Sequence, residues 1–127
     1  MQATDRTVEL EARIFQSLSH PFRLQVLEVL RNGEVCVCHL SALFDRPQPY
    51  VSKQLAELKE IGLVSDRRDG FRIYYSLADP AVGTVIDSAR LLLLRLGLLD
   101  ASSFTSSAAA AYPVAGCECP RCRGDQT

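Results

Sequence analysis

The sequence has no long uninterrupted apolar segment. Its longest run, from Leu91 to Leu99, is interrupted by Arg95 and is far shorter than the roughly 20 residues of a membrane-spanning helix. The first eleven residues carry three acids and no apolar core of the kind a signal peptide has. We therefore expect neither a membrane partner nor a secretory signal, and predict a cytoplasmic protein.

The sequence also lacks an excess of positive charge. Its formal net charge is −1, so nothing in the overall charge indicates a nucleic-acid partner, and any DNA binding must come from local patterning. Hydrophobic residues make up 47% and charged residues 23%, which is ordinary for a soluble globular protein. A chain of 127 residues has room for one compact domain and a tail.

The composition changes abruptly after Asp100. Residues 101–116 are rich in Ser, Ala, Pro and Gly, which predicts a flexible tail over 101–127 after a domain over 1–100. The tail ends in a cysteine cluster made of Cys117, Cys119 and Cys122.

Hydrophobic periodicity predicts five helices and one hairpin. The helices cover about 5–18, 21–32, a short segment around Leu40, a segment from Pro47 to about Ile61, and 80–99. Two strand-like runs, 63–68 and 71–77, are joined through Asp69-Gly70, a strong hairpin signal. This order predicts a mainly α fold with a two-stranded β-wing, that is, a winged helix-turn-helix.

The segment after Pro47 fits a recognition helix. Its apolar residues Val51, Leu55 and Leu58 point inward, which leaves a polar face for the major groove or its rims. The polar residues are Gln48, Tyr50, Ser52, Lys53 and Gln54. The hairpin adds Arg67, Arg68 and Arg72 for phosphate or minor-groove contact. Between residues 46 and 76 six basic side chains stand against four acidic ones. That balance is modest, so a solvated helix face and a charged hairpin edge stay an alternative.

The last helix is apolar on nearly every side toward its end. Leu91, Leu94, Leu98 and Leu99 add to the buried stripe that begins at Val82. A terminal helix of this kind needs a second surface to cover it. A homodimer interface meets this need, and deeper packing on its own domain is the alternative.

Five cysteines at C-x-C and C-x-x-C spacings favour metal binding over a disulfide framework in a reducing compartment. In a regular helix Cys36 and Cys38 would point about 200° apart, so they can bind one ion only at a frayed or opened helix start. Thiolates are soft ligands that suit As(III), Sb(III), Cd(II), Pb(II), Zn(II) or Cu(I). The alternative for the pair is two small buried hydrophobic residues.

Four signatures in order resemble the ArsR/SmtB metalloregulatory repressors over about residues 8–99. They are His20-Pro21-x-Arg23, the segment Gly33-Glu-Val-Cys-Val-Cys-His-Leu40, the run Gln48-Pro-x-Val-Ser-x-x-Leu55, and Arg67-Arg-x-Gly-x-x-x-Tyr-Tyr75. The resemblance implies a cytoplasmic homodimer, held by its first and last helices, that binds an inverted-repeat operator and is released by its inducer. It implies a regulator of a metal(loid)-resistance operon rather than an enzyme.

The chain departs from the arsenite-responsive pattern Cys-Val-Cys-Asp-Leu-Cys at two positions. His39 replaces the acid and Ser41 replaces the third cysteine. A trigonal As(III) or Sb(III) ion then needs a third thiolate, and the three tail cysteines offer it. Residues 101–116 form a flexible span of roughly 20–25 Å, enough to reach back to Cys36 in the same subunit or the partner.

Other sites and classes stay open. Cys119-Pro-x-Cys122 resembles half of a zinc knuckle, so a four-thiolate site for Cd(II), Pb(II) or Zn(II) is an alternative. A thiol redox switch is another alternative. His39 is either a nearby ligand or a surface residue.

The last helix carries Asp87 but no histidine, which disfavours the Asp/His site used by zinc and nickel members of the family. A redox enzyme built on the tail lacks a surrounding βαβ pattern, and a metal-buffering protein would show no sequence-specific DNA binding.

Overall fold

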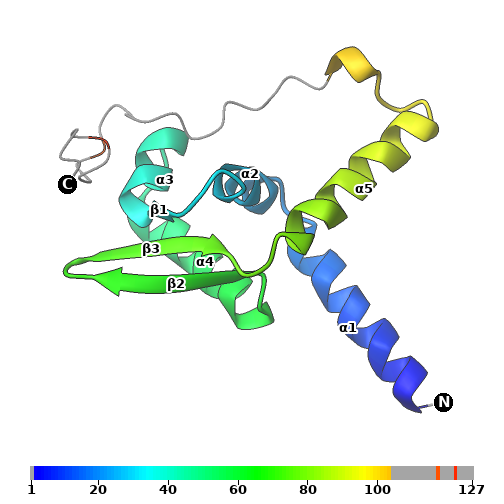
Figure 1. Cartoon of the computed structure of the whole chain (residues 1–127), viewed down its shortest axis with the longest axis horizontal. Coiled ribbons are helices and arrows are strands. Elements are labelled where there is room, and N and C mark those ends of the chain that lie inside the picture. The colour runs from blue at the N-terminus through cyan, green and yellow to red at the C-terminus, as the bar shows by residue number, and fades with distance from the viewer. Residues whose placement is uncertain (1, 104–116, 118–121, 123–127) are drawn as a thin grey trace.

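The computed structural model describes residues 2–103, 117 and 122. Five α-helices and three strands follow one another in the order of a winged helix-turn-helix (Figure 1). The elements are α1 (Gln2–Leu18), α2 (Pro21–Leu30), β1 (Val35–Cys36), α3 (Val37–Phe44), α4 (Gln48–Ile61), β2 (Val64–Asp69), β3 (Arg72–Leu77) and α5 (Ala81–Arg95), with a final 3₁₀ turn at Ala101–Ser103. The predicted fold class is confirmed.

The wing contains one strand more than the sequence predicts. β1 pairs antiparallel with β3, placing Val35 opposite Tyr75 and Cys36 opposite Tyr74, so the sheet order is β1-β3-β2. A strand of two residues is too short to show an alternating hydrophobic pattern, so the sequence does not predict it. The consequence is that Cys36 is fixed to the wing by the backbone of β3.

The hairpin turn lies one residue further along than predicted. Asp69 pairs with Arg72 across β2 and β3, so Gly70 and Phe71 form the two-residue turn. Gly70 has a φ of +61°, the left-handed conformation that such turns need and that glycine adopts at no steric cost. The side chain of Phe71 is fully exposed at the tip.

The core lies where α2, α3 and α4 meet one face of the sheet. Its completely buried side chains come from all three helices and confirm the predicted inward face of α4. They are Val26, Leu27, Leu40, Val51, Leu55 and Leu58. Tyr75 of β3 packs on this core, whereas Tyr74 points to the opposite face. The core thus holds α4 at a fixed distance from the wing.

α1 and α5 extend from the same side of the domain, away from the wing (Figure 1). Both carry exposed apolar side chains. They are Val8, Leu10 and Phe15 on α1 and Val85, Leu91, Leu92 and Leu93 on α5, followed by Leu96 and Leu98. α5 ends at Arg95, earlier than the predicted Leu99, and Gly97 then turns the chain with a φ of +71°. Among the described helices none is both long and apolar enough to cross a membrane.

Candidate thiolate site and DNA-binding surface

Cys36 and Cys38 straddle the junction between β1 and α3. Cys36 is the last residue of β1 and the N-cap of α3, with extended backbone, and its Sγ accepts a hydrogen bond from the His39 backbone N–H at 3.3 Å. Because Cys36 lies outside the helix, the angular separation of a regular helix does not apply. The two cysteines have a Cα–Cα distance of 5.3 Å, and their sulfurs are joined as a disulfide. The start of α3 is therefore where two thiolates can meet one ion once the disulfide is reduced.

Cys117 returns to this junction from the tail. Its side chain is 8% exposed, and its Sγ lies 3.7 Å from Cys38 Sγ. The sulfurs of Cys36, Cys38 and Cys117 all lie within 4.8 Å of one another. Tyr74 packs with Cys36 and Cys117 and covers this cluster from the outer face of β3.

The other two tail cysteines, Cys122 and Cys119, are not part of this cluster of three sulfurs. Cys122 is half-buried, and its Sγ lies 3.3 Å from Nδ1 of His39. The sequence left His39 open between a ligand and a surface residue, and the structure places it entirely inside the protein. Cys119 lies outside the described residues.

A cavity of about 220 Å³ connects the paired cysteines with the predicted DNA-contacting residues. Its lining comes from three elements: the start of α3, the start of α4 and the wing. The lining residues are Cys36, Val37, Cys38, Gln48, Ser52, Phe71, Arg72 and Ile73. Arg72 bridges the two groups directly, because its Nη1 donates a hydrogen bond to Cys38 Sγ at 3.3 Å. The sulfur of Cys38 is thus in direct contact with the wing.

The predicted recognition helix is only partly available to DNA. Gln48, Ser52 and Lys53 are exposed on α4. Tyr50 is half-buried, with its ring centroid 5.2 Å from that of Phe22. The expectation that Gln54 faces outward is wrong: Gln54 is 7% exposed, and its Oε1 accepts a hydrogen bond from Arg23 Nε at 2.8 Å.

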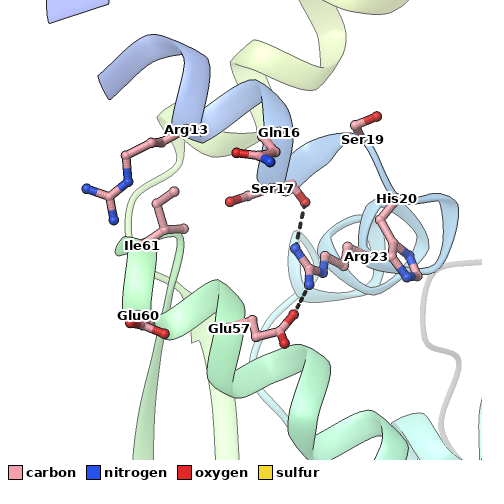
Figure 2. Close-up of a pocket in the computed structure, with 9 residues that line it drawn as sticks. All are labelled: Arg13, Gln16, Ser17, Ser19, His20, Arg23, Glu57, Glu60 and Ile61. Atoms are coloured by element: carbon pink, nitrogen blue, oxygen red, sulfur yellow. Dashed lines mark hydrogen bonds and ion pairs between the residues drawn. The ribbon is translucent and has the colours of Figure 1, made fainter. Parts of the chain in front are cut away.

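Arg23 explains part of the His-Pro-x-Arg signature. From α2 it donates to Glu57 of α4 and to the backbone oxygen of Ser17 at the end of α1 (Figure 2). It also donates to Gln54 of α4. Arg23, Ser17 and Glu57 border a cavity of about 480 Å³ between the three helices, and none of the described cysteines lines it. The sequence analysis did not identify Arg23 as a structural residue. The structure shows that Arg23 is half-buried and pairs with polar residues on the supposed outer face of α4. Arg23 therefore joins α2 to α4 and to the end of α1.

The arginines of the wing have different surroundings. The guanidinium of Arg67 pairs with the Glu34 carboxylate at 2.5–3.0 Å, and these hydrogen bonds raise the pKa of Arg67 above its ordinary value. Its guanidinium also lies 4.7 Å from the ring centroid of Tyr74. Arg68 is exposed, and Arg72 is half-buried against Cys38. Of the three, Arg68 is the most accessible to a phosphate.

Asp87 of α5 belongs to an ion pair. Its two carboxylate oxygens accept hydrogen bonds from Arg31 at the end of α2, both at 2.8 Å. This contact holds the pKa of Asp87 below its ordinary value of 3.8. Among the described residues no histidine or second acid joins Asp87 in a group that could hold a metal ion.

Comparison with known proteins supports the same architecture. Residues 20–66 match the family model described as "Bacterial regulatory protein, arsR family". An uncharacterized HTH-type transcriptional regulator of Methanocaldococcus jannaschii is 37% identical over 61% of this chain and 89% of that protein. The arsenical resistance operon repressor of Escherichia coli is 38% identical, covering 63% of this chain and 72% of that protein.

A solved structure agrees as well. The homodimeric winged helix-turn-helix DNA-binding domain of a possible ArsR-family transcriptional regulator from Mycobacterium bovis superposes with a TM-score of 0.70 at 27% identity, over 79% of this chain and 94% of that one. The order of elements, the recognition helix beside the wing, and the identity to relatives over most of their length give one conclusion. The chain belongs to the arsR family of bacterial regulatory proteins and is a winged-helix transcriptional regulator.

Proposed function

We propose that this protein represses a metal(loid)-resistance operon and leaves its operator when As(III) or Sb(III) binds the thiolates of Cys36, Cys38 and Cys117. The observation that carries the proposal is the convergence of these three sulfurs within 4.8 Å of one another. Two come from the start of α3 and one from the tail, so the tail supplies the thiolate that Ser41 does not. The name of the E. coli relative, an arsenical resistance operon repressor, supports this inducer class.

The donor set fits the ion. Three thiolates are soft ligands, and a trigonal As(III) ion takes three of them. Cys117 is buried and Cys36 is 2% exposed, so the bound ion would be shielded from water. Reduction of the Cys36–Cys38 disulfide must precede binding, and a cellular dithiol supplies the two electrons and two protons and becomes a disulfide itself.

The proposed release from the operator follows from the hydrogen bonds that the sulfurs of Cys36 and Cys38 accept. Cys36 caps α3, and Cys38 accepts a hydrogen bond from Arg72 of the wing. An ion bound to both sulfurs competes for the lone pairs that make these two contacts. Loss of the cap loosens the first turn of α3, and α3 packs directly on α4. The inducer therefore acts on the recognition helix and on the wing together.

The DNA-binding surface consists of Gln48, Ser52 and Lys53 on α4, with Arg68 and Arg72 on the wing. Tyr50 and Arg67 contribute from the rim, where Tyr50 stacks near Phe22 and Arg67 pairs with Glu34. Two such surfaces in a homodimer would bind an inverted repeat. The exposed apolar residues of α1 and α5 form the dimer interface, because a water-exposed face of this size needs a partner.

The test is release of the reduced protein from an operator duplex by arsenite, measured by fluorescence anisotropy. We expect Cys36→Ser, Cys38→Ser and Cys117→Ser to bind operator as the wild type does and to respond to arsenite at least tenfold more weakly. Cys119→Ser is the matched control and should respond normally. A full response from Cys117→Ser, or from a chain truncated after Ala115, would refute the tail ligand. X-ray absorption should count three sulfurs per arsenic.

A redox switch is a second candidate, favoured by the Cys36–Cys38 disulfide. Hydrogen peroxide would oxidise the two thiols to the disulfide and be reduced to two molecules of water. If this is the signal, peroxide must change operator affinity in the wild type and in Cys117→Ser alike, because Cys117 takes no part in the bond. An unchanged affinity after peroxide excludes the switch.

A further inference from the structure

A second group of donor atoms lies next to the three-thiolate site. Nδ1 of His39 and the sulfurs of Cys117 and Cys122 all lie within 4.8 Å of one another. His39 is completely buried and Cys117 nearly so, while Cys122 is half-buried at the outer side. The proposed arsenite site uses neither His39 nor Cys122.

The spacing of these atoms suits a tetrahedral cation. With Zn–S bonds of about 2.3 Å and Zn–N bonds of about 2.0–2.1 Å, tetrahedral ligand atoms lie about 3.5–3.8 Å apart. The His39 Nδ1 to Cys122 Sγ distance is 3.3 Å, and the Cys117 Sγ to Cys38 Sγ distance is 3.7 Å. Small movements would bring His39 Nδ1 and the sulfurs of Cys117 and Cys122 around one ion.

The chemistry of the group differs from that of the arsenite site. Imidazole is a good ligand for Zn(II) and related borderline cations, whereas a trigonal As(III) ion is satisfied by three thiolates. Burial of the imidazole keeps water away from Nδ1, so the nitrogen competes well for a cation that enters. A mixed nitrogen and sulfur set is therefore selective for a divalent ion.

We propose that His39, Cys117 and Cys122 form a binding site for Zn(II) or Cd(II), distinct from the arsenite site and sharing Cys117 with it. This inference rests on the proposed function only for the role of Cys117. Because one sulfur is common to both sets, the bound ion decides whether Cys117 joins the start of α3 or the His39 side. An arsenite ion and a divalent cation then compete for the protein without sharing all their ligands.

Cd(II) is the probe, added to the reduced full-length protein and followed by sulfur-to-cadmium charge-transfer absorption and X-ray absorption. In the wild type we expect one imidazole nitrogen and two sulfurs per cadmium. Cys122→Ser should weaken Cd(II) binding at least tenfold and leave arsenite binding unchanged. Cys36→Ser should weaken arsenite binding at least tenfold and leave Cd(II) binding unchanged. Cys117→Ser should weaken the binding of both ions.

The role of His39 needs a variant that keeps the fold. His39→Asn retains a polar group near the Nδ1 position, and its circular dichroism and melting temperature report whether the domain is intact. In the folded variant the nitrogen signal at cadmium should disappear and the affinity should fall at least tenfold. A cadmium site made only of sulfur in the wild type, or equal losses from Cys36→Ser and Cys122→Ser, would overturn the inference. If arsenite binding instead survives in Cys36→Ser while the cadmium results hold, the proposed function fails and the second site stands.

Discussion

Nη1 of Arg72 donates a hydrogen bond to Sγ of Cys38 at 3.3 Å, which joins a residue predicted to contact DNA to a residue predicted to bind the inducer. The two side chains also line the same cavity, together with Gln48 and Ser52 of α4. The residues predicted to bind the inducer and those predicted to contact DNA are therefore neighbours in this domain, so the proposed release requires no long allosteric path.

Substitution of Arg72 should weaken the coupling between inducer and operator. In Arg72→Ala we expect lower operator affinity, a salt dependence reduced by about one phosphate contact per protomer, and a smaller fold-release by arsenite. Arg68→Ala is the matched control: it removes an exposed wing arginine without a sulfur contact, so its affinity should fall while its fold-release stays that of the wild type. Anisotropy titrations over a range of salt, with and without arsenite, measure both quantities. Equal fold-release in the two variants would contradict the coupling.

The cap of α3 separates the structural role of Cys36 from its role as a ligand. Serine is a good N-cap and alanine is a poor one, so Cys36→Ala should lower the free energy of unfolding by about 1 kcal/mol relative to Cys36→Ser. Both variants should lose the response to arsenite, because neither retains the thiolate. Urea denaturation measures the first effect and operator release the second. Identical stability of the two variants would show that the Cys36 cap contributes nothing.

Gln54 should matter for stability and Gln48 for DNA binding. Gln54→Ala removes the buried acceptor of Arg23, which we expect to cost about 1–3 kcal/mol of unfolding free energy. Gln48→Ala changes an exposed side chain and should alter stability by less than about 0.5 kcal/mol while lowering operator affinity. Denaturation and anisotropy on both variants distinguish the two roles. A stable Gln54→Ala protein with impaired DNA binding would restore Gln54 as a direct contact.

The leucines of α5 should control dimerisation. Leu92 is 56% exposed in the single chain, and burial of a leucine stabilises an interface by about 1.5–3 kcal/mol for each copy. Leu92→Glu should therefore weaken the dimer at least about 100-fold, since two copies are changed. Phe71→Glu makes a similar change at the exposed tip of the wing and should leave the dimer intact. Sedimentation equilibrium without DNA measures both, and a dimeric Leu92→Glu protein would exclude this face.

The Arg31–Asp87 pair should give stability a small dependence on pH. Its hydrogen bonds lower the pKa of Asp87 in the folded protein below the value of about 3.8 in the unfolded chain. The contribution is therefore present above the unfolded pKa and is lost as the pH falls through the folded pKa. Asp87→Asn should be less stable than the wild type near pH 7, and the difference should shrink as the pH falls below about 4. A difference that stays constant with pH would show that the charge of Asp87 is not its cause.

The sequence by itself determined the architecture of this protein, because helix periodicity, a glycine turn and a leucine-rich last helix are local properties of the chain. It also predicts a thiolate site, since the spacing of Cys36 and Cys38 is visible without a structure. The sequence could not show that Gln54 turns inward to Arg23, because one helix position can serve either face when a neighbouring helix offers a partner.

Only the tertiary structure decided which tail cysteine meets which partner. Cys117 reaches Cys38 across 79 positions of the chain, and Cys122 reaches His39 across 83. A hydrophobic period relates residues a few positions apart, so it cannot predict contacts between residues about 80 positions apart. These contacts depend on how Cys117 and Cys122 pack against β1 and α3 in space. The same packing brings Arg72 to Cys38, and so places the proposed thiolate site beside the wing.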